Sequence, residues 1–331
     1  MPVVLITPEI MLHKTVPCLE MLKSAGFEVA YPRNLAFTRG HCSVEETIDE
    51  LSVCDALIAG GEYISQEVFS ALPNLRVIAR AGVGYDRIDV AAATEHGVVL
   101  TITPTANHEA VAEHALMLLL AASKQLSFND RQARAGKWPK QVSYPVRGAT
   151  VGILGLGRIG QSFSLRVRGL GVTIIATEKY PNEAFVLENE IELVDFDTLL
   201  ARSDYLSIHC PINEETLGIF DGEAFGKMKP HSILVNTARG GIVVESDLVA
   251  ALKNGRLRAA GLDCFEQEPP SSDNPLFQLE QVVCTPHIAG SDLKSQDDMG
   301  IESADCITKL YSGQWPAAAV VNGELQNRWK W

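Results

Sequence analysis

The stretch VGILGLGRIG, residues 151–160, joins an apolar run of strand length to the pattern GxGxxG, formed by Gly155, Gly157 and Gly160. An apolar strand, this pattern and a following helix are together typical of a dinucleotide-binding βαβ unit. The glycines permit a tight turn and let backbone N–H groups approach a pyrophosphate, and the helix N-terminus adds partial positive charge. A Walker phosphate loop is excluded, because no Lys-Ser or Lys-Thr pair follows Gly160.

The next apolar run, VTIIAT, leads into Glu178, about 20 residues beyond the glycine pattern. A carboxylate at that place hydrogen-bonds the adenosine ribose hydroxyls of NAD and repels the 2′-phosphate of NADP. Lys179 next to it would weaken this preference, and Glu178 taken alone also fits a solvated loop acid. The sequence predicts NAD as the cofactor.

Short apolar runs alternate with helical patterns along nearly the whole chain, which predicts parallel sheets covered by helices on both faces. A first set of strand candidates precedes Pro104, and a second set of six extends from VGILG to VVCTP, residues 282–286. We therefore predict an α/β protein with two doubly wound parallel sheets. The expected helices lie at about 15–25, 43–52, from 65, from 89, and at 107–125, 246–254 and 292–311.

Length and charge narrow the function classes. A chain of 331 residues suggests about two domains. The net charge of −13 argues against nucleic acid and anionic membranes as partners. The longest apolar stretch, ALMLLLAA, is far shorter than the roughly 20 residues of a membrane span. A small anionic substrate remains compatible with this charge if arginines gather locally.

The seven cysteines are odd in number and include no CxxC pair, which is typical of free thiols in a reducing compartment. An apolar run follows Met1 directly, without the basic segment of a secretory signal. We expect a cytoplasmic protein. His108 and His114 stand six residues apart, whereas HExxH requires four, so we expect no metal site there or elsewhere.

Three residues that follow predicted strands suit the chemistry of a hydroxy acid: Arg239 in VNTARGG, Glu268 in LDCFEQEPP and His287 in VVCTPHIAG. An arginine fork matches a carboxylate, and a histidine exchanges protons near neutral pH. A carboxylate beside the imidazole holds its orientation and favours its charged form. Parallel strands present their ligands at their carboxyl ends, so all three residues are expected at one sheet edge.

The chain resembles the D-isomer-specific 2-hydroxyacid dehydrogenases, especially their phosphoglycerate dehydrogenase and hydroxypyruvate/glyoxylate reductase branch. The matching stretches occur in the family's order across most of the chain: RAGVGYDRID, NHEAVAEHALMLLL, VGILGLGRIGQ, HCPINEETLGIF, VNTARGGIVVE, GLDCFEQEPP and CTPHIAG. The implied reaction is hydride transfer between the nicotinamide of NAD and C2 of a D-2-hydroxy acid or a 2-keto acid. Candidate substrates are 3-phosphoglycerate, hydroxypyruvate and glyoxylate.

The resemblance implies a role for each matching residue. Arg239 would bind the substrate carboxylate and polarise the carbonyl, His287 would be the general acid/base, and Glu268 would pair with it. Asp263 would hold the nicotinamide carboxamide. Substrate contacts would come from Val83, Gly84 and Asn107, together with Arg239 and His287. The remaining cofactor contacts would come from Gly155, Gly157, Arg158, Ile159, Gly160, Glu178, Cys210, Pro211, Thr237 and Ala238.

The resemblance also implies a domain layout. Residues 104–289 would form a Rossmann NAD domain inserted into a flavodoxin-like substrate domain of residues 1–103 and 290–331. The two crossings, near Pro104 and Ala289, would act as a hinge that closes over the substrate. Family members are usually homodimers through the NAD domain, and residues 129–147, with Trp138, would be the interface arm.

Two points stay open in the sequence. Phosphoglycerate-specific members often carry an arginine in the loop after the third strand, where Ala59 aligns here, and Arg80 is the candidate substitute. The alternative function is a non-enzymatic NAD(H)-sensing binding protein of the corepressor type, since such proteins share the fold and keep the same arginine, glutamate and histidine.

Overall fold

The computed structural model describes residues 1–14 and 16–331, and the chain forms two compact units. Unit 1 consists of Met1–Asn107 and Ser291–Trp331, and unit 2 consists of His108–Gly290. Both units contain a fully parallel sheet with helices on its two faces, so the predicted fold class is confirmed. In the part of the chain that the structure describes, no helix is long and apolar enough to cross a membrane.

Unit 1 is built on a five-stranded sheet of order β2-β1-β3-β4-β5, which is the flavodoxin-like doubly wound order. Its strands are β1 (Val3–Ile6), β2 (Glu28–Ala30), β3 (Ala56–Ala59), β4 (Val77–Arg80) and β5 (Val99–Thr101). The central strands are almost entirely buried, which explains why they appear in the sequence as continuous apolar runs.

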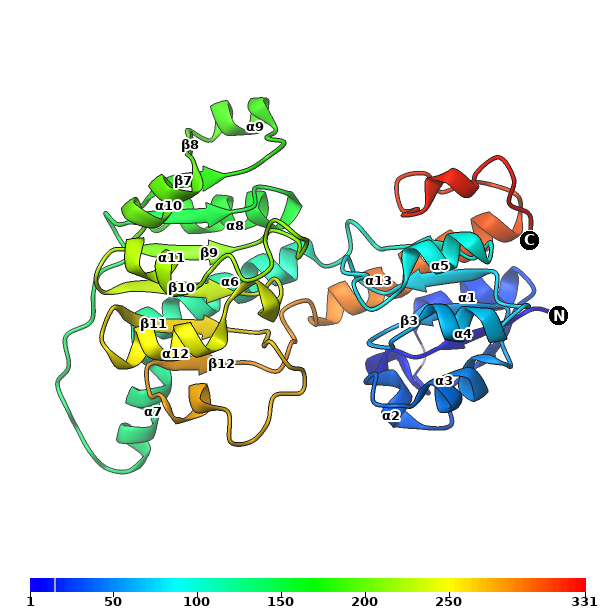
Figure 1. The fold of residues 1–331 in the computed structure, drawn as a ribbon, viewed down its shortest axis with the longest axis horizontal. Helices are drawn as coiled ribbons and strands as arrows, with labels where there is room; N and C mark the ends of the chain where they lie inside the picture. The colour runs from blue at the N-terminus through cyan, green and yellow to red at the C-terminus, as the bar shows by residue number, and fades with distance from the viewer. Residues whose placement is uncertain (15) are drawn as a thin grey trace. The chain divides into compact units, whose positions relative to one another are not determined.

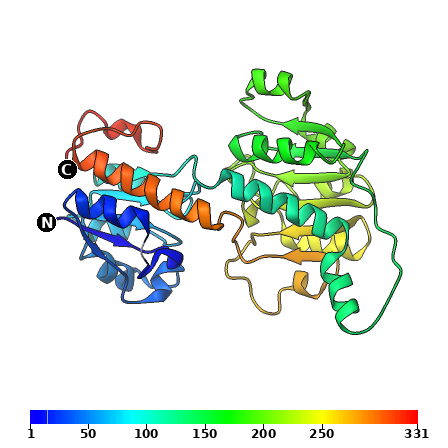
Figure 2. The same cartoon turned by 180° about the vertical axis from the view of Figure 1, so that it is seen from behind.

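Helices cover both faces of this sheet. On one face lie α1 (Pro17–Ser24) and α13 (Leu293–Tyr311), which run side by side (Figure 2). On the other lie α3 (Val44–Leu51), α4 (Gln66–Ala71) and α5 (Val90–Glu95), and α2 (Leu35–Thr38) is a single turn. A capping box begins α3: Glu46 N donates to Ser43 Oγ at 3.2 Å and Ser43 N donates to a Glu46 carboxylate oxygen at 2.8 Å.

The C-terminal segment covers the open edge of this sheet. Val320 forms an antiparallel bridge to Thr101 of β5, and Val321 N donates to Leu100 O at 2.9 Å. Trp329 Nε1 donates to Gly97 O at 2.9 Å. The segment therefore occupies hydrogen-bonding groups that an edge strand would otherwise expose. Its tryptophans, Trp315, Trp329 and Trp331, pack against the core of unit 1 and anchor the segment there.

Unit 2 is built on a seven-stranded sheet of order β12-β11-β10-β9-β6-β7-β8, the order of a Rossmann fold extended by one strand. Six of its strands match those expected: β6 (Thr150–Leu154), β7 (Thr173–Thr177), β9 (Tyr205–Ile208), β10 (Ser232–Asn236), β11 (Leu257–Leu262) and β12 (Val282–Cys284). The seventh, β8 (Glu192–Leu193), is exposed and only two residues long, so it gives no apolar run in the sequence.

Two helix layers enclose this sheet. On one face α6 (His108–Ser123) packs beside α8 (Arg158–Arg168) (Figure 2). On the other lie α10 (Phe196–Arg202), α11 (Gly222–Lys227) and α12 (Glu245–Lys253), while α9 (Glu183–Glu188) lies near β8 (Figure 1). After α6 comes α7 (Leu126–Arg134), and then an extended segment that loops outside the sheet (Figure 1).

One buried acid makes the stability of unit 1 depend on pH. Glu62, in the loop after β3, is 2% exposed, and burial raises the pKa of its carboxyl from 4.5 to about 7. Oε2 accepts a hydrogen bond from Gly60 N at 2.7 Å, whereas Oε1 has no hydrogen-bond partner among the described residues. The charge of Arg80 lowers this pKa, but less than burial raises it.

We expect Glu62→Gln to stabilise the protein in mildly alkaline solution and not in acid. The folded state holds a proton on Glu62 between pH 4.5 and about 7 that the unfolded chain has lost. The free energy of unfolding therefore falls through this window, by about 3 kcal/mol in total. Melting temperatures across this range test it. The melting temperature of Glu62→Gln should exceed that of the wild type above pH 7, and the two melting temperatures should converge near pH 5. The exposed control Glu67→Gln should melt at the wild-type temperature at both pH values. A difference between Glu62→Gln and the wild type that does not change with pH would contradict the expectation.

Candidate active site

The glycine loop between β6 and α8 leaves open space at its central glycine. Gly155 has φ 93°, and a Cβ there would lie 2.6 Å from Cys210 N. A Cβ at Gly160 would lie 2.1 Å from Gly155 O, so helix and strand pack too closely for any side chain. Gly157, by contrast, faces open space, and no side chain caps the N-terminus of α8. The three glycines thus meet the separate requirements of a dinucleotide site.

Glu178, at the end of β7, is tied to the glycine loop. Its Oε2 accepts a hydrogen bond from Leu156 N at 2.6 Å, and Oε1 accepts one from Tyr180 N at 3.0 Å. Lys179 Nζ lies 2.6 Å from Glu215 Oε1, and this bond raises the pKa of the lysine. Lys179, which we expected to weaken the preference for NAD, is thus paired with Glu215 and not with Glu178. This arrangement supports the preference for NAD.

The ends of β9 and β10 supply the other expected cofactor contacts. Thr237 Oγ1 is buried and has no hydrogen-bond partner among the residues described, as expected of a hydroxyl that serves a bound molecule. Burial raises the pKa of the Cys210 thiol to about 12 and lowers the pKa of His209 to about 3. Both side chains are therefore neutral at physiological pH. Arg158 and Ile159 begin α8, Pro211 follows Cys210, and Ala238 follows Thr237.

The loop after β10 fixes the backbone of Arg239. Asn236 Oδ1 accepts from Ala238 N at 3.0 Å, and Asn236 Nδ2 donates to Arg239 O at 2.8 Å. Arg239 Nη1 donates to Ala238 O at 2.7 Å. A Cβ at Gly240 would lie 1.9 Å from Phe265 O, so this loop presses against the loop after β11. Arg239 is thereby held next to the segment that carries Glu268.

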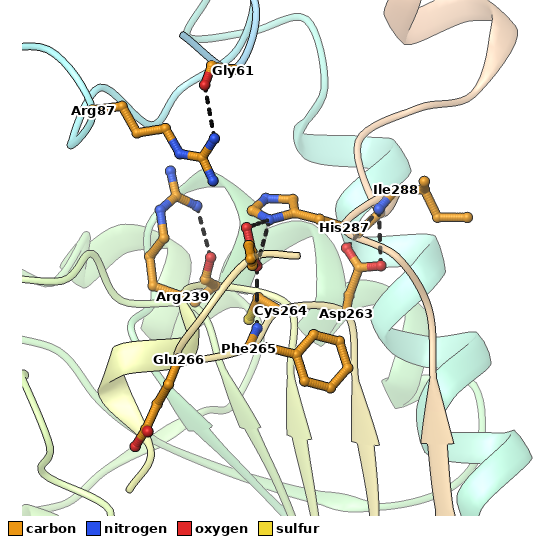
Figure 3. Close-up of polar contacts among 12 residues, drawn as sticks. Gly61, Arg87, Arg239, Asp263, Cys264, Phe265, Glu266, His287 and Ile288 are labelled. Carbon is orange, nitrogen blue, oxygen red and sulfur yellow. Dashed lines mark hydrogen bonds and ion pairs between the residues drawn. The ribbon is translucent and has the colours of Figure 1, made fainter. Parts of the chain in front are cut away.

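His287 and Glu268 form a direct pair. His287 Nδ1 lies 2.8 Å from Glu268 Oε2 and 2.9 Å from Oε1, and Glu268 Oε1 also accepts from Phe265 N at 3.1 Å. The His287 side chain is 44% exposed and that of Glu268 is 19% exposed. Because Nδ1 faces the carboxylate, Nε2 is the ring atom that remains to exchange a proton. Figure 3 shows Arg239 and His287 extending to the same side, beyond the carboxyl ends of the strands.

Asp263, directly after β11, is 1% exposed and holds the loop that follows β12 (Figure 3). Its Oδ1 accepts from Ile288 N at 3.0 Å and its Oδ2 from Ala289 N at 2.8 Å. Thr285 Oγ1 donates to Oδ1 at 2.6 Å, and His114 Nε2 lies 2.9 Å from that hydroxyl. The contacts of Thr285 and His114 were not predicted from the sequence. The one feature of the sequence that could have indicated them was His114 itself, a histidine inside an apolar helix.

The expected substrate contacts of unit 1 lie in loops at the carboxyl edge of its sheet. Val83 and Gly84 follow β4 and are half-buried. The adjacent loop after β3 is bound to this segment, since Arg87 Nη1 donates to Gly61 O at 2.8 Å (Figure 3). Asn107 is the last residue of the N-terminal part of unit 1, and its buried Oδ1 has no partner in the described part of the chain.

These features define unit 2 as a dinucleotide-binding domain with an arginine and a histidine–glutamate pair beside the cofactor site. Residues 116–289 match the family described as "D-isomer specific 2-hydroxyacid dehydrogenase, NAD binding domain". The chain belongs to the D-isomer-specific 2-hydroxyacid dehydrogenase family, as its motifs predicted, and unit 2 is its NAD-binding domain.

Relatives with named activities fall into two groups. A D-3-phosphoglycerate dehydrogenase of Mycobacterium leprae is 45% identical over 275 residues, which are 82% of this chain and 52% of that protein. A glyoxylate reductase of Korarchaeum cryptofilum is 40% identical over 84% of this chain and 86% of that protein. The solved structure of the TT0316 protein from Thermus thermophilus is 31% identical, covers 96% of this chain and all of that one, and has a TM-score of 0.85. The chain thus spans about half the length of the first relative.

Proposed function

We propose that this protein is an NAD-dependent oxidoreductase that interconverts a small D-2-hydroxy acid and its 2-keto acid. The observation that carries the proposal is the His287–Glu268 pair, 2.8 Å apart, beside Arg239 at the ends of three adjacent strands of an NAD-binding domain. Family membership and the two named relatives support the same reaction class.

In the proposed reduction, bound NADH supplies a hydride to C2 of the keto acid. Arg239 binds the substrate carboxylate through its fork and polarises the carbonyl. His287 donates the proton from Nε2 to the carbonyl oxygen as the hydroxyl forms, and Glu268 holds Nδ1 and stabilises the ring while it is charged. In the oxidation, His287 accepts the hydroxyl proton instead.

Asp263 is suited to hold the nicotinamide carboxamide. A carboxylate has about four acceptor positions. Two on Oδ1 are used by Thr285 and Ile288, and one on Oδ2 is used by Ala289. One position on Oδ2 is therefore left for an amide N–H₂ donor. We propose unit 1 as the substrate domain, with contacts from Val83, Gly84 and Asn107, and the two chain crossings between the units as its hinge.

A panel of 2-keto acids tests the function. The wild-type protein is mixed with NADH and glyoxylate, hydroxypyruvate, phosphohydroxypyruvate, pyruvate or 2-ketoisocaproate, and the loss of NADH absorbance is followed. Turnover on at least one acid is expected. NADH that binds without turnover on any of them would contradict the proposal. A strong preference for phosphohydroxypyruvate over hydroxypyruvate would mean that Arg80 or another cation replaces the arginine that is missing at Ala59.

Glu178→Gln is expected to narrow the preference for NADH over NADPH by about tenfold or more. The change keeps an acceptor for Leu156 N but removes the charge that binds ribose hydroxyls and repels a phosphate. Fluorescence titration of both reduced cofactors measures the ratio of their dissociation constants. The matched control is Glu183→Gln, an exposed glutamate of α9, which should leave the ratio unchanged. An unchanged ratio in Glu178→Gln would remove Glu178 from the cofactor site.

We further propose a homodimer formed through the arm of residues 129–147. Trp138 is 81% exposed and Val142 is 92% exposed, and two large apolar side chains on one extended segment are typical of a surface that a partner covers. Sedimentation of the intact protein tests this, and a monomer at micromolar concentration would contradict it. Seven free cysteines, four of them buried, support a reducing compartment such as the cytoplasm.

A further inference from the structure

The turn that carries His287 has a conformation that its own sequence does not favour. His287 has φ 53°, in the left-handed region that glycine adopts and other residues avoid. Such a conformation persists only where the surroundings fix it. Within the turn, the only bond that directly holds the His287 backbone is that from His287 N to Thr285 O at 3.1 Å, among the bonds of the described residues.

The buried carboxylate of Asp263 fixes the turn on both sides of His287. On the C-terminal side it accepts the N–H of Ile288 at 3.0 Å (Figure 3), and it also accepts the N–H of Ala289 at 2.8 Å. On the N-terminal side it accepts the hydroxyl of Thr285 at 2.6 Å. Three donors converge on one carboxylate, so the position of His287 depends on the position of Asp263.

The direction of each hydrogen bond follows from the chemistry of the groups. Thr285 Oγ1 donates its single hydroxyl proton to Asp263 Oδ1 at 2.6 Å. His114 Nε2 lies 2.9 Å from Thr285 Oγ1 and must therefore donate to that hydroxyl oxygen. The distance of 3.6 Å from His114 Nε2 to Asp263 Oδ1 is too long for a second hydrogen bond. The donors thus run in one direction, from His114 to Thr285 to Asp263.

Two acceptors lie near the Thr285 hydroxyl. Leu262 O is an alternative acceptor for that hydroxyl, at 3.5 Å. A donor at His114 occupies a lone pair of Thr285 Oγ1 and strengthens its bond to the carboxylate, because hydrogen bonds in a chain polarise one another. Without that donor, the bond from Thr285 to Asp263 is weaker and Leu262 O competes for the hydroxyl proton, so Asp263 fixes the turn less firmly.

We propose that His114, in α6, is a positioning residue that holds the catalytic turn of His287 in place through Thr285 and Asp263. The inference rests on the proposed function, since it takes His287 as the proton donor. His114 itself touches neither His287 nor Glu268 in the hydrogen bonds described. Its contribution is geometric: a displacement of about 1 Å at the proton donor lowers a rate by about a hundredfold.

His114→Leu is expected to lower kcat by tenfold or more while the dissociation constant of NADH stays within about twofold. The loss of kcat is calculated per NADH-binding site, so that unfolded molecules do not contribute. Thr285→Val should act similarly, and the double variant should be no slower than Thr285→Val alone, because both changes break one chain of hydrogen bonds. His114→Gln, whose amide can donate to Thr285, should restore most of the rate. The matched control is His41→Leu, an exposed histidine of unit 1.

Amide hydrogen exchange of the peptide that contains Ile288 and Ala289 gives a readout that does not need turnover. Exchange should be at least about tenfold faster in His114→Leu than in the wild type or His41→Leu, because two donors lose a fixed acceptor. Unchanged exchange, or losses of kcat that multiply in the double variant, would overturn the proposal. A wild type that is inactive on every keto acid, but shows the faster exchange in His114→Leu, would instead contradict the proposed function and leave the positioning role standing.

Discussion

Replacing His287 with asparagine should lower kcat by about a thousandfold, within the range of about 10²–10⁴ that general acid–base catalysis contributes. Asparagine is close in size and keeps a donor that can face Glu268, now 2.8 Å from Nδ1, but it has no group that exchanges a proton in place of Nε2. NADH should still bind, because the glycine loop and Glu178 are untouched. Steady-state assays on the best keto acid and an NADH titration measure the two effects.

The control for this change is His41→Asn, at an exposed histidine, which should keep the wild-type rate. Glu268→Gln should cause a smaller loss than His287→Asn, because the neutral amide still contacts Nδ1 but no longer stabilises the charged ring. A His287→Asn variant with a rate within tenfold of the wild type would show that another group moves the proton.

Replacing Arg239 with glutamine should reduce kcat/KM by roughly thirtyfold to several thousandfold. The guanidinium and the substrate carboxylate form a hydrogen-bonded charge pair, and removing one partner of such a pair costs about 2–5 kcal/mol of binding free energy. Arg239→Lys keeps the charge but not the planar fork, so its kcat/KM should lie between that of the wild type and that of Arg239→Gln. The measurement is kcat and KM on the same keto acid, with both expected to worsen.

Arg168→Gln is the matched control, because Arg168, at the C-terminal end of α8, is 46% exposed and contacts only Asn189 and Glu190 among the side-chain contacts described. It should stay within twofold of the wild type. If Arg239→Gln changed KM for the keto acid no more than Arg168→Gln does, Arg239 would not be the carboxylate-binding residue.

The sequence predicted most of the fold because the buried strands and helices have regular apolar patterns. It missed β8, which is two exposed residues long, and α7, which has no buried residue. It did not predict that Lys179 pairs with Glu215, since such surface pairs depend on loop conformation rather than on periodicity.

The candidate site was predictable to a similar extent. Arg239, Glu268 and His287 each follow a strand of one parallel sheet, so their shared edge follows from topology alone. The link from His114 to Thr285 spans 171 residues and depends on how α6 packs against the sheet, which no local pattern encodes. The buried state of Glu62 is also a tertiary property, because its loop has no apolar repeat.

The position of α13 has a consequence for biosynthesis. Met299, Ala304 and Ile307 of this helix complete one core of unit 1, whose sheet is made entirely from the first 101 residues. The ribosome makes all of unit 2 before α13 emerges, which takes about 10–40 s at roughly 5–20 residues per second. During that interval the apolar face under α13 is uncovered on the nascent chain, while unit 2, a single continuous segment, folds without waiting. Unit 1 therefore begins to fold before unit 2 and completes its fold after unit 2.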